Sequence, residues 1–115
     1  MQKLLQSFRY AKSGLLTVLR EEDNFQVEII MSVAVCILGF LVHLGRGEWL
    51  FICVAITLVL SSEIINTVVE DLCNKIEPTH NNVIGKIKDM SAAFTLVMCI
   101  GSAIIGLIIF LPHFF

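Results

Sequence analysis

Residues 49–76, WLFICVAITLVLSSEIINTVVEDLCNKI, begin as an unbroken apolar run and acquire acids and amides only after Leu60. As a single helix at about 1.5 Å per residue, this stretch would be ~42 Å long. The hydrocarbon core of a bilayer is about 30 Å thick, so the apolar part can cross it while the polar end projects into water. The stretch therefore predicts an integral membrane protein.

Two further segments have the length and composition of membrane spans. Residues 90–111 carry no charged side chain. Residues 29–44 are shorter, and they become long enough if their helix begins earlier in the chain. We expect the three spans to lie within helices over 27–44, 49–76 and 88–111.

Residues that break helices lie between these spans. Gly45-Arg46-Gly47 separates the first span from the second within a few residues, so these two are expected to form a helical hairpin. Pro78 is expected to end the second span, and Pro112 to end the third.

The N-terminal residues predict a different kind of helix. Apolar side chains such as Leu4, Phe8 and Leu15 fall on one face at helical spacing, and polar side chains fall on the other. Such a helix is too polar to span a membrane and lies in its interface. The expected architecture is an all-α membrane protein of one domain, 1–115, with a surface helix over 1–22 and three transmembrane helices.

The composition agrees with this architecture. Of the 115 residues, 57% are hydrophobic and 16% are charged, whereas soluble domains are about 25% charged. The net charge of −2 provides no basic field for a phosphate backbone, so we exclude nucleic acid as a partner. The four cysteines are widely spaced and are interpreted as small hydrophobic residues.

Lysine and arginine counts predict the orientation. Seven of the eight Lys and Arg residues lie in the N-terminal segment or in the second loop, between Lys75 and Lys88. Short cytoplasmic loops carry an excess of these residues. The N-terminus and the second loop are therefore expected to be cytoplasmic.

Glu63, Asn66, Glu70 and Asn74 form one polar stripe on the second span, because their spacing keeps them on one side of a helix. A charge at membrane depth costs about 2.5–3.5 kcal/mol on insertion scales, so such residues usually serve a function. The predicted topology brings other ionisable residues to the same cytoplasmic end of the spans. They are Glu21, Glu22, Asp23, Glu28, Lys88 and Asp89.

These residue types suit phosphoryl transfer with a nucleotide and Mg²⁺. Carboxylates bind Mg²⁺, a lysine binds phosphate, and a partly desolvated glutamate serves as a general base. Each part also has an ordinary interpretation: Glu21–Asp23 as a solvated run, Lys88 as a cytoplasmic flank, and Glu63 and Glu70 as partners of lysines. The usual phosphate-binding loops are absent from the sequence. With few residues outside the spans, a nucleotide site is expected to be shared between subunits.

Small residues follow one face of the third span. They are Ser91, Ala92, Thr95, Cys99, Ser102 and Gly106. We interpret this face as helix packing in preference to a substrate groove, because small residues let helices approach closely in lipid.

The run Glu63–Glu70, EIINTVVE, resembles the signature of the small bacterial integral-membrane lipid kinases, a family that includes diacylglycerol kinase and undecaprenol kinase. Lys88-Asp89 matches the K-D motif of that family, and Glu22–Phe25, EDNF, resembles its E-x-N segment. Three segments resemble the undecaprenol kinase branch in particular: residues 39–42, 48–49 and 106–112.

The resemblance implies a homotrimer in the bacterial plasma membrane that transfers the γ-phosphate of ATP to a lipid primary hydroxyl. Glu63 would be the catalytic base, Glu22 and Glu70 would bind Mg²⁺ and ATP, and Glu28 would lie with Glu63 at the lipid substrate. The resemblance also implies nucleotide contacts for Lys3, Tyr10, Asn66, Thr79, His80, Asn81, Lys88 and Asp89.

The expected function is the phosphorylation of undecaprenol to undecaprenyl phosphate. Within the family, the alternative acceptor is diacylglycerol, which would give phosphatidic acid. From another class, the alternative is a small proton-coupled exporter, which would favour four spans and an acid near the midplane. A non-catalytic packing subunit would not need Glu63 and Glu70 on one face.

Overall fold

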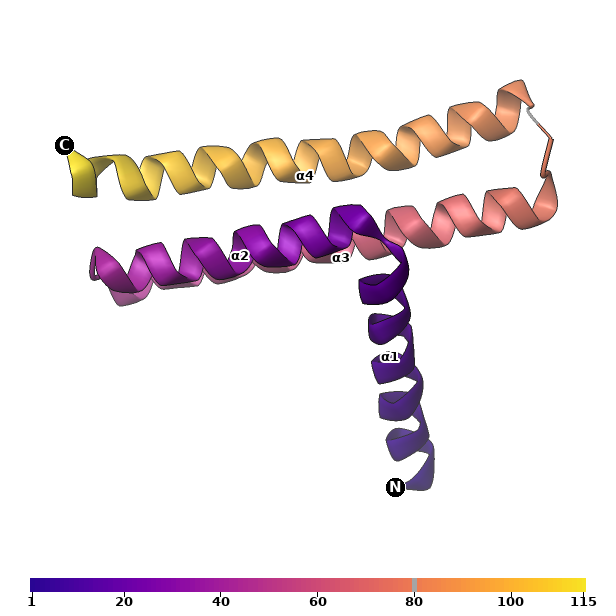
Figure 1. The fold of residues 1–115 in the computed structure, drawn as a ribbon, viewed down its shortest axis with the longest axis horizontal. Coiled ribbons are helices and arrows are strands. Elements are labelled where there is room, and N and C mark those ends of the chain that lie inside the picture. Colours follow the sequence, from indigo (N-terminus) through magenta and orange to yellow (C-terminus); the bar gives the residue numbers. More distant parts are fainter. Residues whose placement is uncertain (80) are drawn as a thin grey trace.

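The structure is a computed structural model that describes residues 1–79 and 81–115. Within these ranges it consists of helices and contains no strand, in the order α1 (Gln2–Glu21), α2 (Asp23–Leu41), α3 (Arg46–Ile76) and α4 (Asn82–Phe114). The last three are long and apolar enough to cross a membrane. Figure 1 shows them side by side, with α1 leading away crosswise. The expectation of an all-helical protein with three spans is confirmed.

Helix α3 lies at the centre, packed against both α2 and α4. Two hydrogen bonds cross from α4 to α3: Thr95 Oγ1 donates to the Ser62 carbonyl and Ser102 Oγ donates to the Ala55 carbonyl, each at 3.2 Å. Such bonds need close helix approach, which small side chains permit. The small-residue face of α4 therefore packs on α3, as expected from the sequence.

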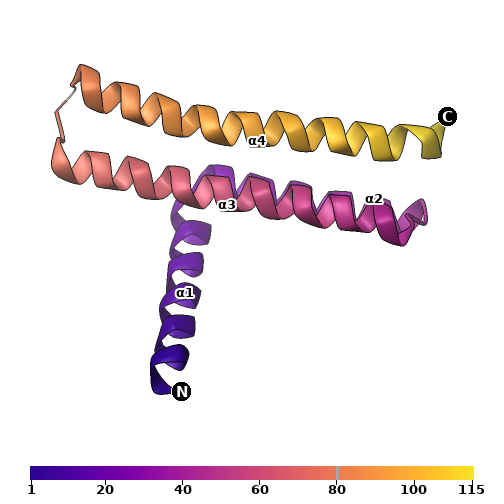
Figure 2. The same ribbon diagram turned by 180° about the vertical axis from the view of Figure 1, so that it is seen from behind.

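Helix α1 meets the bundle part-way along α3 (Figures 1 and 2). The last turns of α3 and the first turns of α4 extend beyond that level. That the polar end of the second span projects into water stays a prediction. Helix α4 begins at Asn82, earlier than the predicted residue 88, because Asn81 Oδ1 accepts from the amides of Val83 (2.8 Å) and Ile84 (3.3 Å).

The opposite end of the bundle is a tight turn between α2 and α3. The sequence places this turn at Gly45–Gly47, but the left-handed residue is His43, with φ 59°, and Gly47 lies in the first turn of α3. The glycine that the packing requires is Gly39. A Cβ atom there would lie 2.7 Å from the Trp49 ring, so no larger residue fits.

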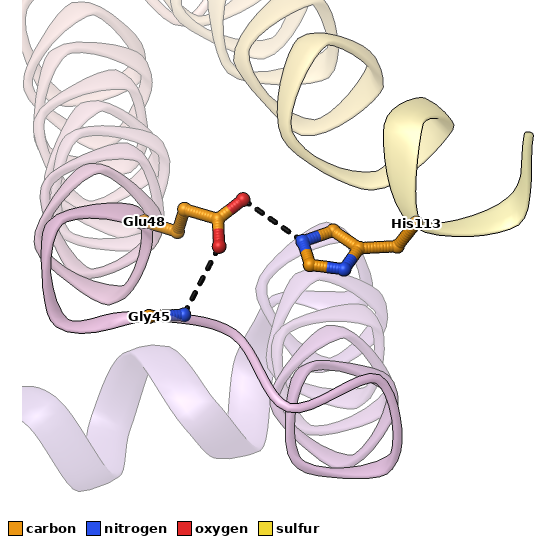
Figure 3. A network of polar contacts seen from close by, with 3 residues as sticks. All are labelled: Gly45, Glu48 and His113. Carbon is orange, nitrogen blue, oxygen red and sulfur yellow. Dashed lines mark hydrogen bonds and ion pairs between the residues drawn. The ribbon is translucent and has the colours of Figure 1, made fainter.

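Figure 3 shows the polar contacts that join the ends of α3 and α4. Glu48 Oε1 accepts from the Gly45 amide at 3.0 Å, and Glu48 Oε2 lies 2.9 Å from His113 Nε2. The expectation that Pro112 ends the third span is wrong, because α4 continues through it to Phe114. A proline near a helix end removes few backbone hydrogen bonds, so the helix can continue through it. The contact between His113 and Glu48 also holds this last turn of α4 against α3. The four cysteine thiols are free.

Candidate active site

Glu63 and Asn66 lie on the face of α3 that the bundle buries, with only 3% and 6% of their surface exposed. They are one helical turn apart, and the Asn66 carboxamide lies near the Glu63 carboxylate. A buried carboxylate is costly unless it is paired or functional. The polar stripe predicted from the sequence therefore turns inward at these two residues.

Glu28 on α2 faces Glu63 across the interior. The two carboxylates are close enough to interact electrostatically, and the Cys99 thiol of α4 interacts with both. Glu28 Oε2 is buried and has no hydrogen-bond partner among the described residues. Three helices thus meet at two carboxylates, one of which has a free acceptor atom. A ligand hydroxyl is the kind of donor that this atom lacks.

An apolar groove of about 240 Å³ runs from Glu28 along the interior of the bundle. Its rim residues Met31 and Ala103 are exposed, so the groove opens at the outer surface of the bundle. Between Cys99 and Phe110, α4 lines it over about 16 Å. The other lining residues are Ser32, Val35, Ile52, Ala55, Ile56, Val59, Ser102 and Gly106. The small-residue face of α4 therefore lines a groove as well as packing on α3.

A cluster of acids lies where α1 meets α2. The pKa of Glu22 is raised, first by burial and then by the negative charges of Glu70 and Asp71. Within the part of the chain described, no three side chains are arranged to ligate a metal ion by themselves. Mg²⁺, however, is usually held by one or two carboxylates and the phosphates of its substrate. Glu22 and Glu70 fit that requirement, because their mutual repulsion is relieved by a cation.

A second cavity, of about 220 Å³, lies at the turn between α3 and α4. Thr79, Asn81 and Lys88 line it together with Glu77. The Thr79 hydroxyl and amide both donate to Glu77, and these bonds lower the pKa of the Glu77 carboxyl. Three of the residues predicted to contact a nucleotide therefore share one cavity. His80, predicted to act with them, lies outside the described residues.

Other predicted site residues stay apart from this cavity. Tyr10 is 74% exposed on α1, and Lys3 is exposed in the first turn of the same helix, whose N-terminal end points away from the bundle (Figure 1). Asp89 is exposed on α4 and does not line the cavity. A single chain thus gathers the acids with Asn66 in one group and the turn residues in another, and Lys3 and Tyr10 belong to neither.

Sequence reasoning missed three features of this region. Asp71 adds charge beside Glu22, and Asn74 accepts a hydrogen bond from Lys88. Ser91 places a buried hydroxyl on the inner face of α4, and this hydroxyl has no hydrogen-bond partner among residues 1–79 and 81–115. Asp71 directly follows Glu70 in the sequence, so its contribution to the acidic cluster could have been predicted. The other two depend on the packing of α3 against α4, which helical periodicity does not specify.

A family described as prokaryotic diacylglycerol kinase matches residues 9–110 of the chain. The chain belongs to this family. It is 37% identical to the undecaprenol kinase of Bacillus subtilis, over 97% of this chain and 91% of that protein. It is 30% identical to a diacylglycerol kinase of Synechocystis, over 95% of this chain and 63% of that protein. Identity to a diacylglycerol kinase of Haemophilus influenzae is 26%, over 93% and 92% of the two chains.

The family resemblance deduced from the Glu63–Glu70 motif is therefore confirmed. The protein is a lipid kinase, and its three apolar helices make it a multi-pass membrane protein. Membership in a kinase family implies ATP as the phosphoryl donor and a membrane lipid as the acceptor.

Proposed function

We propose that the protein transfers the γ-phosphate of ATP, with Mg²⁺, to the primary hydroxyl of undecaprenol. The observation that carries the proposal is that Glu28 lines an open apolar groove and that its carboxylate interacts with the carboxylate of Glu63. A groove of this kind accommodates a hydrocarbon chain, and the pair of carboxylates beside it accepts the proton of a hydroxyl. Both needs are met by one ligand, a long-chain alcohol in the membrane.

Glu63 is the general base in this proposal. It is the more deeply buried of the two carboxylates, and Asn66 lies against it. Glu28 Oε2 accepts a hydrogen bond from the lipid hydroxyl and orients it. Glu63 then takes the hydroxyl proton while the oxygen bonds to the γ-phosphorus, and the bond to the β-phosphate breaks to release ADP.

The nucleotide lies between the acidic cluster and the α3–α4 turn. Glu22 and Glu70 would hold Mg²⁺, which neutralises phosphate charge and draws the reacting groups together. Lys88 would supply a positive charge to the phosphates, with Thr79 and Asn81 beside it in the same cavity. Asp89 and Asn66 would complete the nucleotide contacts, as the family resemblance implies.

A homotrimer would complete this site. Lys3 and Tyr10 are exposed on α1 and do not reach the acids of their own chain, so their nucleotide contacts belong to a neighbouring subunit. The α3 face opposite the site offers a surface for association. Its exposed apolar residues form two sets, each with spacings of three and four, and the two sets are separated by seven residues, as in coiled-coil contacts with one position left out. They are Phe51, Val54, Leu58, Ile65, Val68 and Leu72.

The lysine and arginine distribution supports a cytoplasmic site in the bacterial plasma membrane. Most of these residues lie on α1 or beside the α3–α4 turn, at the end of the bundle that carries the acids. ATP is a cytoplasmic substrate, so this orientation places the nucleotide cavity on the side where ATP is supplied. Helix α1 would lie in the interface at the same level as Glu22.

The choice of acceptor is tested with purified protein, radiolabelled ATP and one lipid at a time. Undecaprenol, diacylglycerol and a lipid-free blank form the three arms, with products separated by thin-layer chromatography. We expect Mg²⁺-dependent labelling of undecaprenol at a kcat/KM at least tenfold above that of diacylglycerol. A preference for diacylglycerol would overturn the acceptor, and labelling of neither lipid would overturn the kinase proposal.

A further inference from the structure

Two buried polar atoms at the α3–α4 interface have no hydrogen-bond partner among the described residues. One is Asn66 Oδ1 on α3, and the other is Ser91 Oγ on α4. Most buried polar groups in folded proteins are paired, so each exception calls for an explanation. Neighbouring hydroxyls at this interface follow the rule: Ser62, Thr67, Thr95 and Ser102 each donate to a backbone carbonyl.

The register of the two helices places these atoms opposite each other. Thr95 bonds to the Ser62 carbonyl and Ser102 bonds to the Ala55 carbonyl, so the two bonds are separated by seven residues on each helix. The antiparallel pairing is therefore constant over two turns. One further turn of about four residues on each helix leads from Ser62 to Asn66 and from Thr95 to Ser91.

The Asn66 side chain connects Ser91 to the reacting groups. Its carboxamide has an amino end and a carbonyl end, and the amino end is the one that can donate to the Glu63 carboxylate. That orientation turns Oδ1 away from Glu63, in keeping with its lack of a donor from the chain. A hydroxyl that donates to Oδ1 would prevent the amide from flipping and would keep its amino group on Glu63.

We infer that Ser91 is a positioning residue: its hydroxyl donates to Asn66 Oδ1 and so fixes the amide that orients the Glu63 carboxylate. The contact requires only a rotation about the Ser91 χ1 bond or one bridging water molecule. The inference rests on the proposed function, because it makes Ser91 serve a base that acts on a lipid hydroxyl. It also gives a role to a buried hydroxyl at a position where an alanine would pack.

The coupling is tested directly by NMR, without reference to catalysis. The full-length protein is labelled with ¹⁵N-asparagine in detergent micelles, and Asn66→Gln identifies the Asn66 side-chain signal by its loss. We expect Ser91→Ala to shift this signal and to speed its hydrogen exchange at least tenfold. Thr95→Val, which removes a neighbouring hydroxyl on the same face, should leave the Asn66 signal unchanged.

Kinetics then separate positioning from packing. In Ser91→Ala, kcat should fall about five- to tenfold, the equivalent of one hydrogen bond, while the KM values for ATP and lipid stay within about twofold. Ser91→Thr keeps a hydroxyl and should recover most of kcat. The melting temperature of Ser91→Ala should fall only slightly, by no more than the loss of one hydrogen bond, since Asn66 Oδ1 loses its donor. Thr95→Val should show a lower melting temperature with kcat retained.

The outcomes distinguish the inference from the proposed function. Unchanged exchange at Asn66 in Ser91→Ala overturns the coupling, whatever the activity. Faster exchange with unchanged kcat overturns the positioning role, and a kcat loss that Ser91→Thr does not restore assigns Ser91 to packing. If the wild-type protein labels neither lipid, the proposed function fails, and the NMR result alone decides whether Ser91 holds Asn66.

Discussion

Lys88 Nζ donates a hydrogen bond to Asn74 Oδ1 and thereby ties an early turn of α4 to the last turn of α3. Lys88 also lines the cavity that is lined by Thr79 and Asn81. An amide accepts this bond without neutralising the ammonium, so Lys88 keeps its full charge for a phosphate group. An aspartate at the Asn74 position would instead compete with the nucleotide for the lysine.

Lys88→Met should raise the KM for ATP about ten- to a hundredfold, because a charge-assisted hydrogen bond of about 1.5–3 kcal/mol is lost. Asn74→Asp should raise it more modestly, since an ion pair would hold the ammonium away from the phosphates. Steady-state kinetics at saturating lipid measure both effects. Lys86→Met is the matched control, as Lys86 is exposed on the same helix and does not line the cavity. An equal effect of the two lysine variants would remove Lys88 from the nucleotide site.

Mg²⁺ binding should weaken as the pH falls, because Glu22 takes up a proton more readily than an ordinary glutamate. Its pKa is raised from 4.5 by burial and by the charges of Glu70 and Asp71. Above this raised pKa, the charged carboxyl opposes folding of the metal-free protein. Stability without Mg²⁺ should therefore increase as the pH falls through the interval between the raised pKa and 4.5. Thermal unfolding with and without Mg²⁺ measures both trends.

Glu22→Gln should remove the pH-dependent gain in stability of the metal-free protein. Glu70→Gln should abolish Mg²⁺-dependent nucleotide binding while the oligomer stays intact, which size-exclusion chromatography with light scattering verifies. If ATP affinity in Glu70→Gln matched that of the wild type, Glu70 would have no metal role.

The groove should control the use of long-chain lipids. Gly106 lines it, and a Cβ atom at Gly106 meets no other atom within 4 Å, so a leucine side chain can enter the groove without disturbing the fold. Gly106→Leu should raise the KM for undecaprenol at least tenfold and that for a short-chain alcohol much less. Gly101→Leu is the matched control, because Gly101 has the same free space but lies outside the groove. If Gly106→Leu raised the KM values for undecaprenol and for the short-chain alcohol equally, the lipid chain would bind outside this groove.

Periodicity and charge were sufficient to predict the helices and the polar stripe, and they identified the candidate site residues, whose roles stay predictions. Glu63 and Asn66 could be found because acids and amides at helical spacing are rare in an apolar run. Other features depend on contacts between helices and could not be predicted. The left-handed residue at the first turn is His43, although nearby glycines are the usual choice. The groove face of α4 was interpreted as packing alone, because small residues serve both purposes.

The orientation is tested by labelling single cysteines in intact cells, in a background without the native cysteines. Gly47→Cys should react with a membrane-impermeant thiol reagent from outside, and Asn82→Cys should react only after the cells are opened. Gly47 and Asn82 lie at opposite ends of the bundle, and a Cβ atom at Gly47 meets no other atom within 4 Å. The opposite labelling pattern would place the acids on the outer side and would exclude a cytoplasmic ATP site.

Glu63→Gln should lower kcat by about 10²–10⁴-fold, the range that general-base catalysis contributes. The amide keeps the size of the side chain and part of its hydrogen bonding with Asn66, but it accepts no proton from the lipid hydroxyl. The KM for ATP should change little, because Lys88 and the acids near α1 hold the nucleotide. Pre-steady-state measurement with saturating lipid and ATP isolates the chemical step from product release.

The matched control is Glu48→Gln, the same substitution on the same helix at the far end of the bundle. It alters the contact with His113 and leaves the site intact, so kcat should be retained (Figure 3). A Glu63→Gln enzyme that kept most of the wild-type kcat would reject Glu63 as the base. Glu28 would then be the remaining carboxylate at the end of the groove, and Glu28→Gln would have to show the loss instead.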